Sequence, residues 1–183
     1  MDLPHSFIET YKTSPVICDN LISYHKKNKE YRHVGVTGNG LMDKKIKDSM
    51  DVSFYNDSNN KVIVNFFKEI SKHVSSYVNK YNIGHAVHTC LYNMIQHYGP
   101  GGGYPAIHYE RGPKEMLSRQ LVYMLYLNTV NDKGGTNFPY QKITTRAIKG
   151  DLIIWPAEFT HPHHGVVSPT EEKYIATGWF EIV

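Results

Sequence analysis

The chain has 183 residues, of which 40% are hydrophobic and 20% are charged. This length and composition predict one folded domain with a sizeable core, and they exclude a largely disordered protein. The net charge of +3, with histidine counted as neutral, is too small to indicate a nucleic-acid partner. Two cysteines cannot form a disulfide framework, so we expect Cys18 and Cys90 to be small, reduced core residues.

No part of the sequence has the apolar stretch that a signal peptide or a membrane span needs. The chain begins MDLPHSFIETYK, which lacks an apolar targeting segment. The longest uncharged apolar and aromatic run, residues 121–127, is too short to cross a bilayer. We therefore expect a cytoplasmic protein, in a bacterial or a virus-infected host cell, with no membrane partner.

The first half of the chain predicts helices and irregular structure. An apolar face on residues 15–26 predicts a first helix. Residues 27–60 are polar and contain glycines, which favours irregular structure with short strands. Residues 61–81 form the strongest helix candidate, because their apolar side chains recur mostly at three-to-four spacing. We expect residues 1–88 to form a helical and irregular support region.

The second half of the chain contains many short extended segments between glycine-containing turns. The predicted strands are residues 89–98, 106–110, 119–128, 143–148, 152–155, 160–167 and 173–182. Many short strands behind a helical first half predict a mainly β fold with helices (α+β), either a β-sandwich or an open barrel. We expect a single domain over residues 1–183, with its β core and functional site in residues 89–183.

The motif His108-Tyr109-Glu110 is the most informative feature of the second half. Alternate residues of a strand point to the same face, so His108 and Glu110 can both face inward. Two imidazoles and one carboxylate hold iron(II) on one face and leave positions open for oxygen. A histidine-x-glutamate motif alone is common by chance, so the prediction depends on a third ligand elsewhere in the chain.

Three clustered histidines compete for the third ligand position: His161, His163 and His164. In an extended segment His161 and His163 share a face, and His164 faces away. We choose His163 because Lys173 follows it by ten residues, which allows a return through a turn to a neighbouring strand. A buried lysine would pair with a dicarboxylate co-substrate. His161 and His164 stay open as alternatives.

The order and spacing of five stretches carry a family resemblance. These stretches are YGPGGGYPAIHYE, RQLVYMLYLN, GGTNFP, KGDLIIW and HHGVVSPTEEKYIATGWF. Between residues 98 and 180 the chain resembles the prolyl 4-hydroxylase branch of the iron(II)/2-oxoglutarate dioxygenases, and most closely its short bacterial and viral members. The resemblance implies a double-stranded β-helix, or jelly roll, with helices packed on one side.

The resemblance also implies roles for individual residues. It places Fe(II) on His108, Glu110 and His163, and it pairs Lys173 with the distal carboxylate of 2-oxoglutarate. The residues that it implies around this co-substrate are Tyr98, Tyr126, Thr177 and Trp179. With 14 tyrosines in the chain, core packing is the alternative role for either tyrosine.

Two departures from the family pattern affect the candidate site. The family usually has aspartate where this chain has Glu110, which is one methylene longer. The glycine turn before Thr136 is one residue shorter than usual, so the role of Thr136 is open.

The implied reaction is hydroxylation of a substrate C–H bond. O2 and 2-oxoglutarate are the expected co-substrates, succinate and CO2 are the products of 2-oxoglutarate, and ascorbate is expected to support turnover. A proline-containing peptide or protein is the expected substrate, hydroxylated at the 4-position. Residues 111–118 and 38–57 are candidate loops over the substrate. The alternatives are a nucleic-acid or small-molecule hydroxylase or demethylase on the same fold, and a non-catalytic jelly-roll module that binds peptide or metal.

Overall fold

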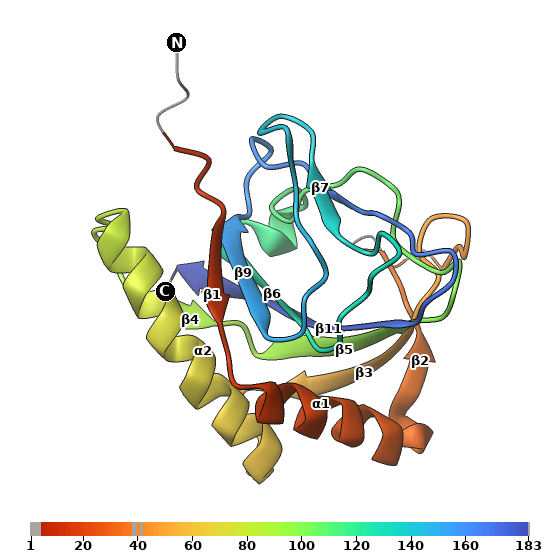
Figure 1. The fold of residues 1–183 in the computed structure, drawn as a ribbon. Coiled ribbons are helices and arrows are strands. Elements are labelled where there is room, and N and C mark those ends of the chain that lie inside the picture. Colours follow the sequence, from red (N-terminus) through yellow and green to blue (C-terminus); the bar gives the residue numbers. More distant parts are fainter. Residues whose placement is uncertain (1–4, 38–39, 41, 183) are drawn as a thin grey trace.

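The computed structural model of the protein describes residues 5–37, 40 and 42–182 (Figure 1). Residues 1–4, at the start of the N-terminal segment, and residues 38, 39 and 41, in the candidate loop 38–57, lie outside the described residues. The helices are α1 (Pro15–Lys27), η1 (Lys29–Tyr31), α2 (Lys61–Lys80) and η2 (Lys114–Met116), of which η1 and η2 are short 3-10 turns. The strands are β1 (Glu9–Lys12), β2 (Arg32–Val34), β3 (Met50–Tyr55), β4 (Val87–Thr89), β5 (Tyr92–Tyr98), β6 (Arg119–Tyr126), β7 (Thr136–Phe138), β8 (Ile143–Thr144), β9 (Asp151–Pro156), β10 (His164–Gly165) and β11 (Lys173–Ile182).

Side-chain caps explain where both α-helices begin. Helix α1 follows Ser14, whose hydroxyl accepts a hydrogen bond from the Val16 amide at 3.3 Å. Helix α2 follows Asn60, whose side-chain oxygen accepts from the Val62 amide at 2.9 Å. Such caps satisfy amide groups that have no partner within the first helical turn. The predictions of helices at residues 15–26 and 61–81 are confirmed to within one residue.

The large sheet is antiparallel, with strand order β1-β9-β6-β11-β5-β3-β2 and with β4 beside the end of β11. Helices α1 and α2 cover one of its faces (Figure 1). Side chains alternate along β6: Leu121, Tyr123 and Leu125 pack in the cluster that contains the buried faces of both helices. Their neighbours Val122, Met124 and Tyr126 pack in a second cluster on the opposite face. The large sheet therefore lies between two packed layers. The layer against the helices is a structural core, and the layer on the other face carries the candidate site.

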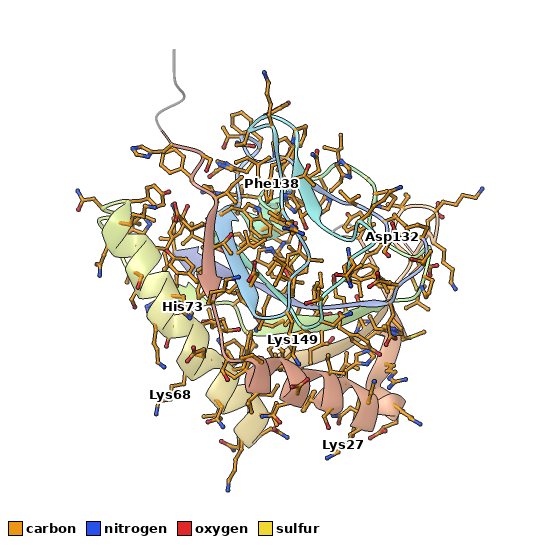
Figure 2. The ribbon with its side chains drawn as sticks, in the orientation of Figure 1. Lys27, Lys68, His73, Asp132, Phe138 and Lys149 are labelled. Atoms are coloured by element: carbon orange, nitrogen blue, oxygen red, sulfur yellow. The ribbon has the colours of Figure 1, made fainter. Side chains whose placement is uncertain are left out.

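A small sheet, β10-β7-β8, faces the side of the large sheet that the helices leave uncovered. Phe138 of β7 lies on this side in Figure 2, whereas Lys27 and Lys68 lie at the outer edge of the helices. Reciprocal backbone hydrogen bonds between His108 and His163 add a single bridge beside β10. Two facing antiparallel sheets buttressed by helices form the double-stranded β-helix, so the predicted fold class is confirmed.

The structure differs from the predicted division of the chain at residue 88, because β1, β2 and β3 belong to the large sheet. Strand β1 escapes sequence prediction because its four residues alternate only between half-buried and exposed. The last part of the candidate loop 38–57 is also not a loop, because residues 50–55 form strand β3. The first strands of the chain thus complete the β core rather than only supporting it.

Three predicted strands are shorter than expected. Segment 160–167 begins as a turn, because the His161 amide donates back to the carbonyl of Glu158 at 2.9 Å and Pro162 has no amide proton for a ladder. Only β10 remains extended there. In segment 143–148 only the two residues of β8 form a strand. In segment 106–110 the ladder is limited to the single bridge between His108 and His163.

Cys18 and Cys90 are both buried and free, as the composition predicts. Among the residues described, no helix is long and apolar enough to cross a membrane.

Candidate metal centre

The structure brings His108, Glu110 and His163 together, each with one potential ligand atom within 4.8 Å of the others. The backbone bridge that holds the two histidines consists of His108 N–H to His163 O at 3.0 Å and His163 N–H to His108 O at 2.9 Å. The Glu110 amide donates to Ala157 O at 3.1 Å, at the end of β9. Hydrogen bonds between distant segments therefore position all three side chains.

The two other histidines of the cluster lie outside this group. The His161 ring faces the carbonyl of Ser6 at 2.9 Å, because the turn before Pro162 directs it toward the N-terminal segment. It does not share a face with His163, contrary to the expectation for an extended segment. His164 lies half-buried with Nδ1 near the Gly165 carbonyl at 3.3 Å. Among the described residues, only His163 of the three joins His108 and Glu110.

The hydrogen bonds of both imidazoles favour a cation between the three side chains. His108 Nδ1 lies 2.8 Å from the Ala106 carbonyl, and His163 Nδ1 lies 3.0 Å from the His161 carbonyl. Because a carbonyl only accepts, each Nδ1 carries a proton, so each ring in its neutral form presents a lone pair on Nε2. These Nε2 atoms face Glu110 Oε1 at 3.6 and 3.5 Å. With both rings in this neutral form, three acceptors face one another and a cation between them is favoured, and this donor set suits Fe(II).

The separations of these atoms also fit a metal ion. Bonds of about 2.1 Å at right angles place two neighbouring ligand atoms about 3 Å apart. The observed 3.5 and 3.6 Å need only a small contraction to reach this value. Burial by itself would raise the pKa of Glu110, but hydrogen bonds and positive charge from His108 and His163 in their protonated form hold this pKa well below its ordinary value. The carboxylate is therefore ionised at neutral pH.

A cavity of about 530 Å³ contains the three side chains and opens beside them. Its apolar walls include Met94, Trp155 and Ile175. Lys173 of β11 also lines it, next to Tyr98 on the paired strand β5. The structure thus brings the predicted lysine and the predicted ligand set into one cavity.

Lys173 is buried and has no counter-ion among the residues that the structure describes. Its side chain is only 5% exposed, and its Nζ donates to the Gly134 carbonyl at 3.1 Å and lies 5.0 Å from the Tyr98 ring centre. Gly134 holds this turn with a φ of +76°, a region that favours glycine. No carboxylate of the described residues pairs with Lys173, and burial lowers its pKa to about 8. A buried, unpaired ammonium in a cavity is a site for an anion.

Tyr98, Thr177 and Trp179 line the cavity, as expected from their positions on β5 and β11. Tyr126 is not among the lining residues. Its hydroxyl lies 2.9 Å from Thr136 Oγ1 and 2.9 Å from Thr145 Oγ1, beneath β7. Thr136 does line the cavity. Tyr126 therefore supports the cavity wall through its hydrogen bond with Thr136. Of these two residues, Thr136 is the one placed to contact a bound molecule.

Sequence reasoning missed two residues that contact the predicted ligands. The Tyr104 ring stacks on His108, with ring centres 3.9 Å apart and an angle of 13° between the planes. Arg119 lies 3.5 Å from Glu110 Oε2, in an ion pair. A glycine-rich turn before Tyr104 hinted at a close approach, but nothing local marks Arg119, whose contact depends on the pairing of distant strands.

The profile of the 2OG-Fe(II) oxygenase superfamily matches residues 93–181. This segment contains the three clustered side chains and Lys173. This segment of the chain belongs to the 2OG-Fe(II) oxygenase superfamily. The protein is therefore a 2-oxoglutarate-dependent dioxygenase, and the family implies Fe(II), 2-oxoglutarate and O2.

Solved structures similar to this oxygenase cover nearly all of its chain. A viral collagen prolyl hydroxylase from Paramecium bursaria Chlorella virus-1 is 21% identical, with a TM-score of 0.72 and 97% of both chains covered. A prolyl-4-hydroxylase from Pseudomonas putida is 16% identical, with a TM-score of 0.75, and the match covers 100% of this chain and 96% of the other. A Trichoplax adhaerens prolyl hydroxylase, solved with a peptide fragment of hypoxia inducible factor, is 13% identical, with a TM-score of 0.78 and coverage of 98% and 86%. At these identities the likeness establishes the fold. No curated protein sequence matches the chain.

Proposed function

We propose that this dioxygenase hydroxylates peptidyl proline, with Fe(II) held by His108, Glu110 and His163 and with 2-oxoglutarate held by Lys173. The observation that carries the proposal is the position of a buried lysine, which has no carboxylate partner among the described residues, in the same cavity as three side chains that could hold a metal ion. The similarity to solved prolyl hydroxylases supports the substrate class. Because β1, β2 and β3 complete the sheet, we also propose that residues 1–183 act as one domain.

Each part of the site has a physical task in this proposal. The Ala106 and His161 carbonyls orient the two imidazoles, so their Nε2 atoms face the metal position. Lys173 pairs with the distal carboxylate of 2-oxoglutarate, and the apolar walls exclude water from the reacting atoms. When bound, Fe(II) supplies the activation of O2 that couples conversion of 2-oxoglutarate to succinate and CO2 with substrate hydroxylation. Ascorbate is expected to sustain turnover when this coupling fails.

The low pKa of Lys173 predicts a pH limit for the use of 2-oxoglutarate. Above about pH 8 the free enzyme loses the ammonium charge, so kcat/KM for 2-oxoglutarate should fall with increasing pH. The opposite trend is expected for stability. Below about pH 8 this lysine is charged in both folded and unfolded chains, and the full cost of its burial is present. Between pH 8 and its ordinary value of 10.5 only the unfolded chain binds the proton, so this contribution to stability rises.

The pH profile of kcat/KM and the pH dependence of thermal unfolding would measure these two trends. In the Lys173→Met variant the rise in stability between pH 8 and 10.5 should disappear. A kcat/KM profile that stays flat from pH 7 to pH 10 would contradict the assignment of Lys173.

An apolar hollow beside the metal centre supports a peptide over a small molecule as the substrate. This hollow has a volume of about 430 Å³ and is lined by Ile107, His108, Tyr109, Gly112, Pro113, Tyr140, Phe159 and Pro162. Tyr140 and Phe159 are 66% and 65% exposed, and exposed apolar clusters of this kind mark binding surfaces. His108, Tyr109 and Pro113 also line the main cavity. An extended chain with its target residue in the cavity would place flanking residues in the hollow.

The segment 111–118, which we consider a loop over the substrate, lies between the two hollows. Pro113 and Met116 line the main cavity, and Gly112 and Pro113 line the outer hollow. Residues 36 and 37, just before the other candidate loop, and residues 46 and 47, within it, also line the main cavity. We therefore propose that both segments contact a bound peptide.

Alanine at both Tyr140 and Phe159 should raise KM for a peptide by roughly tenfold or more, since covering one such ring contributes about 1.5 kcal/mol or more. Peptide-independent conversion of 2-oxoglutarate should not change, because neither ring contacts the cavity around Lys173. Tyr31→Ala is the matched control, because Tyr31 is equally exposed at 66% and lies in η1. An unchanged KM in the double variant would remove the outer hollow from the substrate path.

The proposed activity itself is tested by incubating the protein with Fe(II), 2-oxoglutarate, ascorbate and a library of proline-containing peptides. Succinate release that depends on a peptide, together with addition of one oxygen atom to proline in the mass spectrum, is the expected result. Free proline and a single-stranded oligonucleotide with methylated bases are parallel substrates that test the alternatives. Turnover with one of these alone would reassign the substrate class, and no succinate in any mixture would contradict the enzyme assignment.

A further inference from the structure

The two carboxylate oxygens of Glu110 have different partners. Oε1 faces the two histidines, at 3.6 Å from His108 Nε2 and 3.5 Å from His163 Nε2. Oε2 faces the large sheet, where the Trp179 indole N–H donates to it at 3.1 Å and Arg119 Nη1 lies at 3.5 Å. The carboxylate therefore spans the gap between the histidine pair and the last strand of the sheet.

Arg119 and Trp179 form one rigid unit against this carboxylate. The Arg119 guanidinium lies over the Trp179 ring, 3.6 Å from its centre, a stacking that suits the planar guanidinium. Arg119 Nη1 also donates to the Glu110 backbone carbonyl at 3.3 Å. One guanidinium thus contacts both the backbone and the side chain of Glu110, and the indole below it donates to the same carboxylate oxygen, Oε2.

We propose that Arg119 and Trp179 are positioning residues that fit the metal site to a glutamate, by holding Oε2 on the sheet so that Oε1 alone faces the metal. This inference rests on the metal site of the proposed function. A free glutamate has one more rotatable bond than aspartate and can turn both oxygens to a metal. With Oε2 held by two donors, the carboxylate contributes a single oxygen and leaves coordination positions for the co-substrate.

Because Glu110 spans the gap between the histidine pair and the last strand, aspartate should fit the site less well here, although aspartate is the usual residue of the family. Trp179 is held in β11 and the histidines are held by their mutual backbone bridge, so the gap between them is set by the backbone. Aspartate is one methylene shorter and cannot reach both sides of this gap. Glu110→Asp should therefore weaken metal binding in this chain.

Titration of the full-length protein with Co(II) under nitrogen, followed by visible absorption of the bound ion, measures the site without any enzyme turnover. Trp179→Phe keeps the aromatic ring under Arg119 and removes only the N–H donor. We expect this variant to bind Co(II) roughly 10–100-fold more weakly, the usual effect of losing an outer partner of a metal ligand. Its absorption spectrum should also change, because a freed Oε2 alters the coordination of the ion.

Arg119 is tested with a conservative pair of variants and a distant control. Arg119→Met should weaken Co(II) binding by a similar factor, and Arg119→Lys should recover part of the loss because it keeps the charge. Arg32→Met is the control, because the Arg32 guanidinium bonds the His25 and Lys26 carbonyls near α1. It removes comparable hydrogen bonds and should leave Co(II) affinity unchanged.

A double-mutant cycle separates positioning from a general structural effect. If Trp179 acts through Glu110, adding Trp179→Phe to Glu110→Asp should cost much less Co(II) affinity than Trp179→Phe costs alone. Equal costs in the two backgrounds would overturn the proposal, as would a Glu110→Asp variant that binds Co(II) as tightly as the parent chain. Loss of Co(II) binding in His108→Ala checks the metal site separately, so failure of the site and failure of the positioning pair give different results.

Discussion

His163→Ala should abolish both metal binding and conversion of 2-oxoglutarate. His163 is one of three described side chains that meet at the metal position, and two ligands cannot hold iron on one face with the required strength. The loss should exceed the roughly 10–100-fold that removal of an outer partner costs in metal affinity. Co(II) titration and succinate release measure the two effects.

His161→Ala and His164→Ala are the controls for this result, because they test the two other histidines of the cluster. The His161 ring bonds the Ser6 carbonyl, and the His164 ring lies beside its own strand. Both variants should retain the metal. Metal binding that survives in His163→Ala and disappears in His161→Ala would show that the ligand set is wrong.

Lys173→Met should raise the KM for 2-oxoglutarate by roughly 30-fold or more. Removing one partner of a buried charge pair costs about 2–5 kcal/mol, and each 1.4 kcal/mol is a factor of ten. Methionine has a similar volume, so the cavity keeps its shape while the distal carboxylate loses its partner. Calorimetric titration of 2-oxoglutarate into the Mn(II)-loaded protein gives the affinity directly.

The stability of the same variant separates this effect from unfolding. In the free protein the buried ammonium has no carboxylate partner among the described residues, and burial lowers its pKa to about 8. Replacing it by an apolar side chain removes the cost of burying a charge. The midpoint of thermal unfolding should stay equal or rise at pH 7. Tight 2-oxoglutarate binding in Lys173→Met would contradict the assigned role.

Local sequence signals predicted the helices, a mainly β core and the metal motif, and the family resemblance implied the double-stranded β-helix. The apolar spacing in residues 61–81 depends only on helical periodicity, and glycine turns mark strand ends wherever they occur. His108 and Glu110 share a face because side chains alternate along an extended chain. These signals act over a few residues, so they can be read without knowing which strands pair. The ten-residue spacing between His163 and Lys173 is also local, and it predicted that Lys173 would lie on a strand near the metal motif.

Tertiary structure alone decided which contacts complete the site. The choice between His161 and His163 depends on the turn before Pro162 and on the backbone bridge to His108. Tyr126 lies behind Thr136 because β7 covers the end of β6. The contact of Arg119 and Trp179 with Glu110 depends on the register between β6 and β11, which shifts at residues 180 and 181. A one-residue slip would turn these side chains to the opposite face, and hydrogen bonds between distant strands, absent from any local pattern, fix that register.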